Sequence, residues 1–425
     1  MLFLGVKQSY AAPSLLHGPK DLLDLAKANS SNYLVSLSKL EVSKLELKNN
    51  FANFLPELDL STSQGYAGQK SDPDSSDTDD WTSSLELSLS EKLYDNGTNF
   101  IKYNEAKKNL ILSQLEHEDT TAKLGLEIVK LYLAHMLNLK ILEIQEDQHK
   151  LIVVQFERIK RQYRQGMKTR IDYVRFKARL KRSSLALSKL KLDCQKSLLE
   201  IFKSVGKDSE GFSLMPLKIA ELDLETLPDH PSKLETHYSY KKSLIQKEIN
   251  NYKVDIERKK DGPVVKLTSA VNYINNEYLA GTDSFTNDYN TSWKIQLGVN
   301  FNLLDWGVRS RNVVIAKKEK RQSEHLIDQE IRNLKTGLEN NYADIIQSKE
   351  SYLLNKELVG LEKKNYEAID GKYKNGRVAF LDLINSLTDY SNARESHLRN
   401  HFKLQELMAS YQYHNGKIYE FIENF

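Results

Sequence analysis

The chain has 425 residues, of which 40% are hydrophobic and 28% charged, and its formal net charge is +3. This length predicts two or three domains, and so small a net charge points to no particular partner. No run approaches the roughly 18 apolar residues of a membrane-spanning helix, which excludes a helical integral membrane protein but leaves a membrane-spanning sheet open. The single cysteine, Cys194, excludes an intramolecular disulfide, a four-cysteine zinc site and a CxxC redox motif.

The first 18 residues differ in character from the rest of the chain. A short apolar run at 1–6 is followed by small residues at Ser9, Ala11 and Ala12. This order is typical of the end of a secretory signal, although no basic residues precede the apolar run. We therefore assign residues 1–18 either to a signal-peptide remnant or to an N-terminal arm.

The remainder of the chain repeats itself with an offset of 210 residues. Three short motifs recur at this offset: LYDNG at 93–97 and LLDWG at 303–307, YRQG at 163–166 and YKNG at 373–376, and ID at 171–172 and LD at 381–382. Because all three keep one register, chance is a poor explanation. We expect two similar halves, residues 19–210 and 211–425, the second opening with a linker.

Each half is predicted to begin with a helix and a pair of strands. Leucines near helical spacing predict a helix over 19–54, and its counterpart lies at 232–260. Pro56 and Pro263 end these helices. Alternation of apolar and other residues then predicts two strands in each half, at 58–60 and 85–89 in the first half and at 265–267 and 295–303 in the second.

A very long helix follows each strand pair. The tracts Gly97–Gly166 and Gly307–Gly376 contain no proline. Each would extend for roughly 100 Å, so packing in a coiled coil or bundle must stabilise it. Each tract should reverse at its final glycine, because glycine adopts a positive φ without strain, and a shorter helix returns to about Val205 or Asn415.

The four strands raise a closure problem. About eight strands is the smallest closed barrel, and an open sheet edge in lipid would leave backbone groups without hydrogen-bond partners. The strands therefore either form a soluble sheet packed on another element or close between chains, and three chains would supply twelve strands. In the second case one phase of the alternation faces lipid, and it contains Leu87, Leu89, Leu297 and Val299. The aromatic residues near the strand ends suit an interfacial girdle or an ordinary sheet: Trp81, Tyr94, Trp293 and Trp306.

This pattern resembles the TolC-like outer-membrane factor family. The resemblance covers about residues 20–415 and rests on the order, doubling and spacing of the motifs around Pro56, Asp95-x-Gly97 and Tyr163-x-x-Gly166 and of their second-half copies. It implies an α+β fold in which a trimeric outer-membrane β-barrel, with four strands per chain and twelve in total, continues into a long antiparallel α-helical coiled-coil periplasmic tunnel.

The resemblance also implies roles for particular residues. The turns at the ends of the long helices would be the adaptor-docking tips: Gly166, Met167 and Lys168 in the first half, and Gly376, Arg377 and Val378 in the second. Asp172, Tyr373 and Asp382 match positions that help close the periplasmic mouth in the family. Some members carry an arginine where this chain has Val378 and an aspartate where it has Asn385, so the family's closure network is only partly present.

Three other groups of residues have plainer interpretations. Residues 158–182 carry eleven Lys or Arg side chains against one acid, Asp172, which suits a solvated helix face, steering of an adaptor or substrate, or a nucleic acid. His397 and His401 are four residues apart, as metal ligands on a helix can be, but we expect surface histidines and no metal site. The acidic segment Asp72–Asp80 lacks the glycine of an EF-hand, so we expect a solvated loop.

The sequence therefore predicts a passive outer-membrane exit channel of a tripartite efflux pump or type I secretion system, not an enzyme, without cofactors. Its partners would be two further copies of the chain, a periplasmic adaptor, an inner-membrane transporter and outer-membrane lipid, with no nucleic acid, and most of the chain would lie in the periplasm. The alternative is a soluble coiled-coil scaffold or adaptor protein with a small β-domain. A basic coiled-coil nucleic-acid binder is a third alternative.

Overall fold

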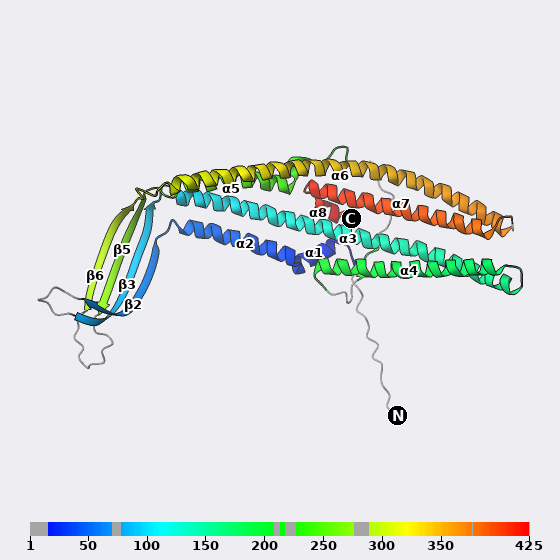
Figure 1. Ribbon diagram of the computed structural model, residues 1–425, viewed down its shortest axis with the longest axis horizontal. Coiled ribbons are helices and arrows are strands. Elements are labelled where there is room, and N and C mark those ends of the chain that lie inside the picture. The colour runs from blue at the N-terminus through cyan, green and yellow to red at the C-terminus, as the bar shows by residue number, and fades with distance from the viewer. Residues whose placement is uncertain are drawn as a thin grey trace, which may run out of the picture. The chain divides into compact units, whose positions relative to one another are not determined.

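The computed structural model describes residues 16–69, 78–207, 213–216, 227–275, 289–375 and 377–424 (Figure 1). The first half of the chain contains α1 (Pro19–Asn29), α2 (Ser31–Ala52), β2 (Glu57–Gln69), β3 (Thr78–Tyr94), α3 (Thr98–Arg164) and α4 (Arg170–Val205). The second half contains α5 (Tyr238–Lys259), β5 (Val264–Asn275), β6 (Tyr289–Asn300), α6 (Val308–Lys374) and α7 (Phe380–His414). Four short elements accompany them: β1 (Leu16–His17), β4 (Ser213–Leu214), η1 (Leu234–Thr236) and α8 (Ile418–Glu423).

The repeat predicted from the sequence is confirmed in the backbone. The helices α3 and α6 each have 67 residues, and they start 210 positions apart, at Thr98 and Val308. The left-handed residues before them keep the same offset, because Asn96 and Gly97 correspond to Trp306 and Gly307. The sequence motifs therefore mark two copies of one backbone.

The opening helix is not continuous as predicted. It divides at Ser30, whose backbone is extended with φ −69° and ψ 123°, into α1 and α2. The side-chain amide of Asn29 donates a hydrogen bond to the Leu25 carbonyl, so a side chain serves as a donor to a helix carbonyl at this break. Local side-chain competition of this kind leaves no trace in the leucine spacing from which one helix was predicted.

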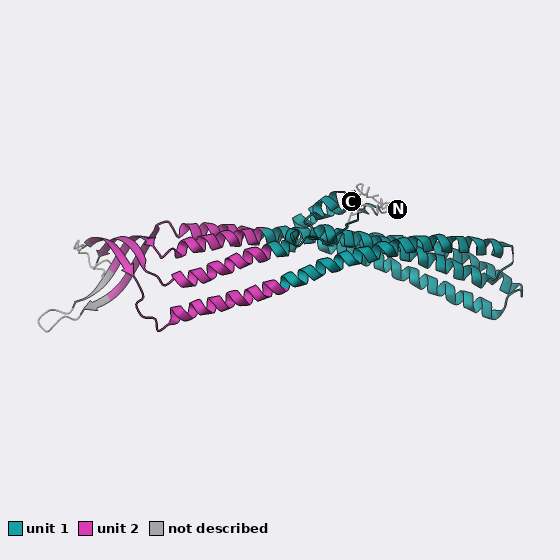
Figure 2. Cartoon of the chain, turned by 90° about the horizontal axis from the view of Figure 1, so that it is seen from above, with its two compact units in different colours: residues 1–38, 115–241, 330–425 teal, residues 39–114, 242–329 magenta. Residues whose placement is uncertain are grey.

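The chain forms two compact units, and each takes segments from both repeats (Figure 2). Unit 1 comprises residues 1–38, 115–241 and 330–425, and unit 2 comprises residues 39–114 and 242–329. Each compact unit therefore combines segments of both repeats. The repeat boundaries at 19–210 and 211–425 stay a prediction. Across the described residues, no helix is both long and apolar enough to cross a membrane.

Unit 2 contains a four-stranded antiparallel sheet in the order β2-β3-β5-β6. Its strands have 13, 17, 12 and 12 residues, so the first pair is longer than alternation of leucines alone indicated. The ladder between β2 and β3 continues through the pair Tyr66 and Trp81, where few leucines remain to mark it. One bulge interrupts the pairing of β3 with β5, between Lys92 and Tyr94.

Unit 1 has the largest apolar core among the described residues. Helices α1, α3, α4, α7 and α8 contribute to it, and its most buried members include Leu22, Ile128, Tyr132, Ile201, Phe402 and Ile418. The return helix α4 ends in this core at Gly206, whose φ is +72° and whose N–H donates to the Phe202 carbonyl. A left-handed glycine at this position is a common helix terminator.

We expect Gly206→Ala to destabilise the protein more than Gly416→Ala. Both glycines have φ +72°, so both substitutions incur the left-handed strain of about 1–2 kcal/mol. A Cβ at Gly206 would lie 2.8 Å from the backbone oxygen of Asn29, whereas a Cβ at Gly416 meets nothing within 4 Å. Urea denaturation of the purified variants should therefore rank Gly206→Ala lower, and equal losses would refute the close approach.

Candidate functional site

One face of the sheet is apolar and exposed. Cross-strand partners point to the same side of a sheet, and the register pairs Leu87 with Leu60 and Val271, and Leu297 with Leu267. These pairings place all four predicted lipid-facing residues, Leu87, Leu89, Leu297 and Val299, on one face. Their side chains are between 40% and 65% exposed, which is unusual for leucine and valine in a sheet.

The opposite face of the same sheet is polar. Each of its main polar residues has a polar partner on at least one neighbouring strand: Ser61, Ser63, Ser84, Ser88, Thr268, Asn272 and Gln296. Two apolar residues of β5 share this face, Ile274 opposite Ser84 and Ala270 opposite Ser88. The Ser63 and Ser84 hydroxyl oxygens lie 2.7 Å apart in a cross-strand hydrogen bond. A sheet with one apolar and one polar face can separate a hydrocarbon phase from water.

Aromatic side chains accompany the apolar face near the strand ends. Trp293 lies on that face opposite Val271, and its side chain is 75% exposed. Trp306 follows β6 with φ 54°, and Tyr94 ends β3; both are exposed. The side chain of Trp81 lies outside the described residues. A girdle at a membrane interface stays a prediction for these residues.

Two equivalent turns join the sheet to the long helices. The Asp95 carboxylate accepts hydrogen bonds from the N–H groups of Gly97 and Asn99, at 3.1 and 2.7 Å. The Asp305 carboxylate accepts in the same way from Gly307 and Arg309, at 2.9 and 2.6 Å. The Arg309 N–H and then the Gly307 N–H lower the pKa of Asp305. The aspartate of each repeated motif therefore caps a long helix.

The first tip, the turn between α3 and α4, reverses at Gly166 as predicted, with φ +72°. Met167 and Lys168 follow it and are exposed. Asp172 lies in the first turn of α4. Its carboxylate accepts from the Thr169 hydroxyl at 2.9 Å, and the Thr169 hydroxyl accepts from the Asp172 N–H. This capping box fixes where α4 begins.

The second tip, between α6 and α7, has a similar start. The Ala379 N–H donates to the Asp382 carboxylate at 3.2 Å, so Asp382 also lies in the first turn of its helix. Arg377 is exposed and Val378 is half-buried, whereas Gly376 lies outside the described residues. The structure gives both mouth aspartates a capping function, and a role in closing the mouth stays a prediction.

A clasp of four residues joins the two tips, and the sequence did not single it out. The Arg179 guanidinium donates to the Thr388 hydroxyl at 2.6 Å and to the Ile384 carbonyl at 3.4 Å, linking α4 to α7. Beside it the rings of Phe176 and Phe380 lie 4.4 Å apart. We call Phe176, Arg179, Phe380 and Thr388 the clasp. Its only sequence signal was an arginine among ten other basic residues.

Tyr373, the third predicted mouth residue, lies in the apolar cluster next to the clasp. Its ring is 5.5 Å from the ring of Phe380, and the Arg158 guanidinium lies 5.3 Å from its centre. The same cluster buries Ile152, Leu383 and Ile384. Tyr373 thus contributes to contacts between the tips through its ring.

A cavity of about 810 Å³ opens between α3, α4 and the start of α7. Its walls include cationic side chains from α4 and the first tip, Lys168, Arg175, Arg179 and Arg182. Apolar side chains form another part of the wall, among them Ile152, Phe176 and Phe380. We call this the tip cavity. Its combination of charge and apolar surface suits a ligand that is both acidic and apolar.

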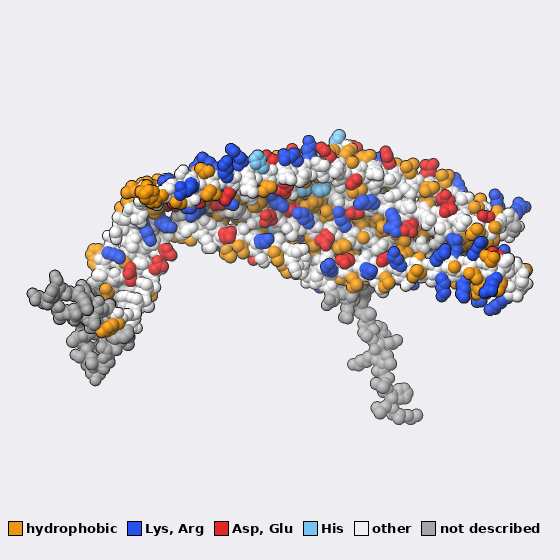
Figure 3. All heavy atoms as spheres, viewed as in Figure 1, with side chains coloured by type: hydrophobic (Ala, Val, Ile, Leu, Met, Phe, Trp, Pro, Cys, Tyr) orange, Lys and Arg blue, Asp and Glu red, His pale blue; other side chains and the backbone are white. Residues whose placement is uncertain are grey.

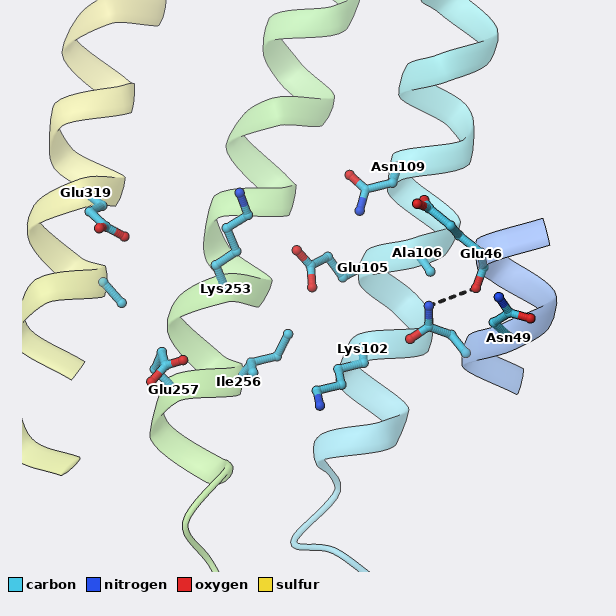
Figure 4. Close-up of a pocket in the computed structure, with 12 residues that line it drawn as sticks. Glu46, Asn49, Lys102, Glu105, Ala106, Asn109, Lys253, Ile256, Glu257 and Glu319 are labelled. Carbon is cyan, nitrogen blue, oxygen red and sulfur yellow. Dashed lines mark hydrogen bonds between the residues drawn. The ribbon is translucent and has the colours of Figure 1, made fainter. Parts of the chain in front are cut away.

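A second cavity, of about 570 Å³, lies among α2, α3, α5 and α6 in unit 2 and is polar (Figure 4). The carboxylates of Glu46, Glu105, Glu257 and Glu319 line it together with Lys102 and Lys253. Burial raises the pKa of Glu105, and the two lysines oppose that effect. Such a wall is suited to water and small polar solutes.

The prediction that His397 and His401 are surface residues was wrong. His401 is only 1% exposed, and its ring lies 5.8 Å from that of Tyr352 and 5.5 Å from that of Phe402. His397 is half-buried and stacks on Tyr352 at 4.9 Å. Because the two histidines are four residues apart, both lie on the face of α7 that packs against α6. Their charge and polarity alone did not indicate that this face is covered. Among the described residues no group of three or more ligating side chains could hold a metal ion.

His401 should make the protein sensitive to acid. Burial, and then the neighbouring His397, lower the pKa of His401 from 6.5 to about 4 in the folded chain. As the pH is lowered, the unfolded chain therefore takes up this proton before the folded chain does. The free energy of unfolding is highest above pH 6.5 and decreases as the pH drops toward 4, by about 3 kcal/mol at most. Urea denaturation across this range should give a shallower pH dependence for His401→Leu, and an unchanged slope would contradict the assignment.

Comparison with known proteins identifies the family of the chain. A profile of the family described as "Outer membrane efflux protein" matches residues 22–207 and 241–409, one segment in each repeat. A sequence search of curated proteins finds no match.

The fold is similar to those of crystallised channels. For the CmeC outer membrane channel of Campylobacter jejuni the TM-score is 0.83, with 16% identity over 96% of this chain and 88% of that one. For VceC of Vibrio cholerae the values are 0.76 and 14%, over 94% and 96%. For the MtrE channel of Neisseria gonorrhoeae they are 0.75 and 15%, over 94% and 89%. The repeat, the two-faced sheet and the family match agree: the chain belongs to the outer membrane efflux protein family and is an outer-membrane efflux channel, not an enzyme, with a periplasmic helical tunnel.

Proposed function

We propose that three copies of this chain form one passive exit duct, to which a periplasmic adaptor and an inner-membrane transporter deliver the substrate. The observation that carries this proposal is the exposed apolar face of the sheet. Among the described strands, the outer ones, β2 and β6, each have one free edge, and lipid does not tolerate unpaired edges. Joining β6 of one copy to β2 of the next would remove all edges and close twelve strands into a barrel with the polar face inside.

The return helix supports assembly between copies. Exposed small or apolar residues recur at every seventh position of α4: Ile171, Ala178, Leu185, Leu192 and Leu199. A repeat of seven keeps one stripe facing a partner helix. On α6, Leu354 and Leu361 have the same spacing and are also exposed. Packing the α4 stripe of one copy on α6 of the next would give a head-to-tail interface, which closes as a ring.

The tips would serve as the docking and closing region. Gly166, Met167, Lys168, Gly376, Arg377 and Val378 would contact the adaptor. Around a threefold axis Asp172 and Asp382 would form rings of like charge near the mouth, where they repel one another. The clasp, together with Tyr373, would hold the tips of each copy together in the closed mouth, in place of the family's closure residues that this chain lacks at Val378 and Asn385. The duct itself would do no work, and the transporter would supply the energy.

Reconstitution tests this proposal. The protein purified from outer membranes in mild detergent should cross-link in a ladder that ends at three copies, and it should conduct ions in planar bilayers. A soluble scaffold would instead remain in the soluble fraction as a coiled coil without conductance. A monodisperse monomer with no conductance would refute the proposal.

A further inference from the structure

The end of the sheet that adjoins the helices carries exposed apolar side chains. All four connections between sheet and helices lie at this end, because β2 and β5 start there and β3 and β6 end there. Leu303 and Trp306, between β6 and α6, are 89% and 81% exposed, the highest fractions among the large apolar side chains of the described residues. Figure 3 shows hydrophobic side chains gathered where the sheet meets α5 and α6. Exposed apolar surface of this kind marks contact with lipid or with another molecule.

A cation lies over each of the two turns that join the sheet to a long helix. The Arg311 guanidinium donates to the Trp306 carbonyl at 3.0 Å, and a Cβ built on Gly307 would lie 3.1 Å from it. At the equivalent turn of the first repeat, the Lys259 ammonium lies 3.6 Å from the Cβ position of Gly97. Both cationic side chains are exposed.

The end of α5 holds these two turns beside each other. The Asn96 side-chain amide donates to the Lys259 carbonyl at 3.0 Å, and the Arg309 guanidinium donates to the Arg258 carbonyl at 3.2 Å. Consecutive carbonyls of α5 therefore bind the start of both long helices, which brings the two cations to one place in the fold. We call four exposed residues at this place the collar: Lys259, Leu303, Trp306 and Arg311.

The collar cations lack a carboxylate partner within the described part of the chain. Neither Lys259 nor Arg311 forms an ion pair there, whereas Arg258 and Lys260 on either side of Lys259 are paired with acids at 3.2 and 3.0 Å. The aspartates that cap α3 and α6 already accept hydrogen bonds from helix N–H groups. Two unpaired cations beside exposed apolar side chains suit a ligand with an anionic group and a hydrocarbon part.

We propose that the collar binds the headgroup of an anionic phospholipid in the leaflet that faces the periplasm. This inference rests on the proposed function, because it requires the apolar face of the sheet to contact lipid. The phosphate would pair with Lys259 and Arg311, and the acyl chains would lie on Leu303 and Trp306. A guanidinium can donate two parallel N–H bonds to a phosphate, and an indole ring suits the boundary between headgroups and hydrocarbon.

The apolar face of β6 favours a lipid over other occupants. Ile295, Leu297 and Val299 lie on that face and are 68%, 62% and 65% exposed, and Leu303 follows at the same spacing of two along the sequence. The collar therefore continues the surface that would contact hydrocarbon. A free phosphate would engage the cations alone and leave Trp306 in water.

Quenching of Trp306 fluorescence by brominated lipids tests the proposal. The chain has three tryptophans, so Trp81→Phe/Trp293→Phe leaves Trp306 as the only one. This full-length protein is reconstituted into phosphatidylcholine vesicles that contain a small fraction of brominated phosphatidylglycerol or brominated phosphatidylcholine, at about 0.15 M salt. Because each cation near a membrane surface strengthens binding of anionic lipid about fivefold, phosphatidylglycerol should be enriched at Trp306 about tenfold or more over its fraction in the vesicle.

Two double variants in this background separate the collar from general surface charge. Lys259→Gln/Arg311→Gln should abolish the enrichment. Lys317→Gln/Lys318→Gln removes the same charge from exposed positions further along α6, outside the collar, and should retain it. Equal losses in the two variants would overturn the site, as would equal quenching by the two brominated lipids. Inorganic phosphate that removes the enrichment at about 10 mM would assign the cations to a soluble anion and likewise overturn the proposal.

Conductance distinguishes a failure of this inference from a failure of the proposed function. A protein that conducts in planar bilayers, but whose Trp306 neither lipid quenches, would overturn the inference, because a second copy or another protein would then cover the collar. The proposed function would remain intact. A protein that is quenched but never conducts would instead refute the proposed function. Circular dichroism and gel filtration of each variant confirm that the substitutions have not unfolded the protein.

Discussion

Leu87→Arg should prevent the protein from assembling in the outer membrane. Leu87 lies at the middle of β3 and is paired with Leu60 and Val271 on the apolar face. An arginine at the bilayer midplane costs about 2–4 kcal/mol, and every copy in an oligomer would bear that cost. The measurement is the amount of folded, heat-modifiable oligomer recovered from outer membranes, together with urea denaturation of protein refolded into lipid vesicles.

Two control variants test whether the loss of assembly depends on the face of the sheet and on the depth of the substituted position. Ser88→Arg introduces the same side chain at the adjacent position of β3, which faces the polar side, so assembly should survive. Val299→Arg lies on the apolar face one residue from the end of β6, where an arginine costs only about 0–1 kcal/mol. Equal losses at Leu87 and Ser88 would show that the apolar face does not contact lipid.

Arg179→Ala should open the periplasmic mouth. The guanidinium donates two hydrogen bonds from α4 to α7 and is half-buried, so its loss should destabilise the closed arrangement by about 1–2 kcal/mol. That difference changes the ratio of open to closed channels by a factor of roughly 5–30. Single-channel recordings in planar bilayers should therefore show a higher open probability, without any loss of assembled oligomer.

The pairing can be isolated from other effects of the substitution. Thr388→Ala removes the acceptor, and the Arg179→Ala/Thr388→Ala variant should open the channel little more than either single variant, because both remove one interaction. Arg179→Lys keeps the charge but replaces the planar guanidinium by a more strongly hydrated ammonium on a shorter side chain, so it should restore closure only in part. Lys181→Ala removes an exposed charge two residues further along α4 and serves as the control. An unchanged open probability in Arg179→Ala would exclude the clasp as the closing device.

The repeat, the two-faced strands and the long helices follow from the order of the residues alone. These features are local or periodic. The alternation of Leu85, Leu87 and Leu89 defines one face of a strand, and a glycine after a long helix without proline marks its reversal. The 210-residue offset carried each of them to the second half, where α6 begins at Val308 as the first half requires. The same reasoning identified the family from the order of its motifs.

The contacts between side chains of different helices could not be predicted from the order of the residues. Nothing in the spacing indicated that Arg179 of α4 reaches Thr388 of α7, which is 209 residues away. The burial of His401 depended on the packing of α7 against Tyr352 of α6, and a polar residue in a charged helix reads as exposed until that partner is known. Helix periodicity determines which residues share a face, but contacts between helices determine which face is covered, and those contacts are set by the packing of elements far apart in the chain.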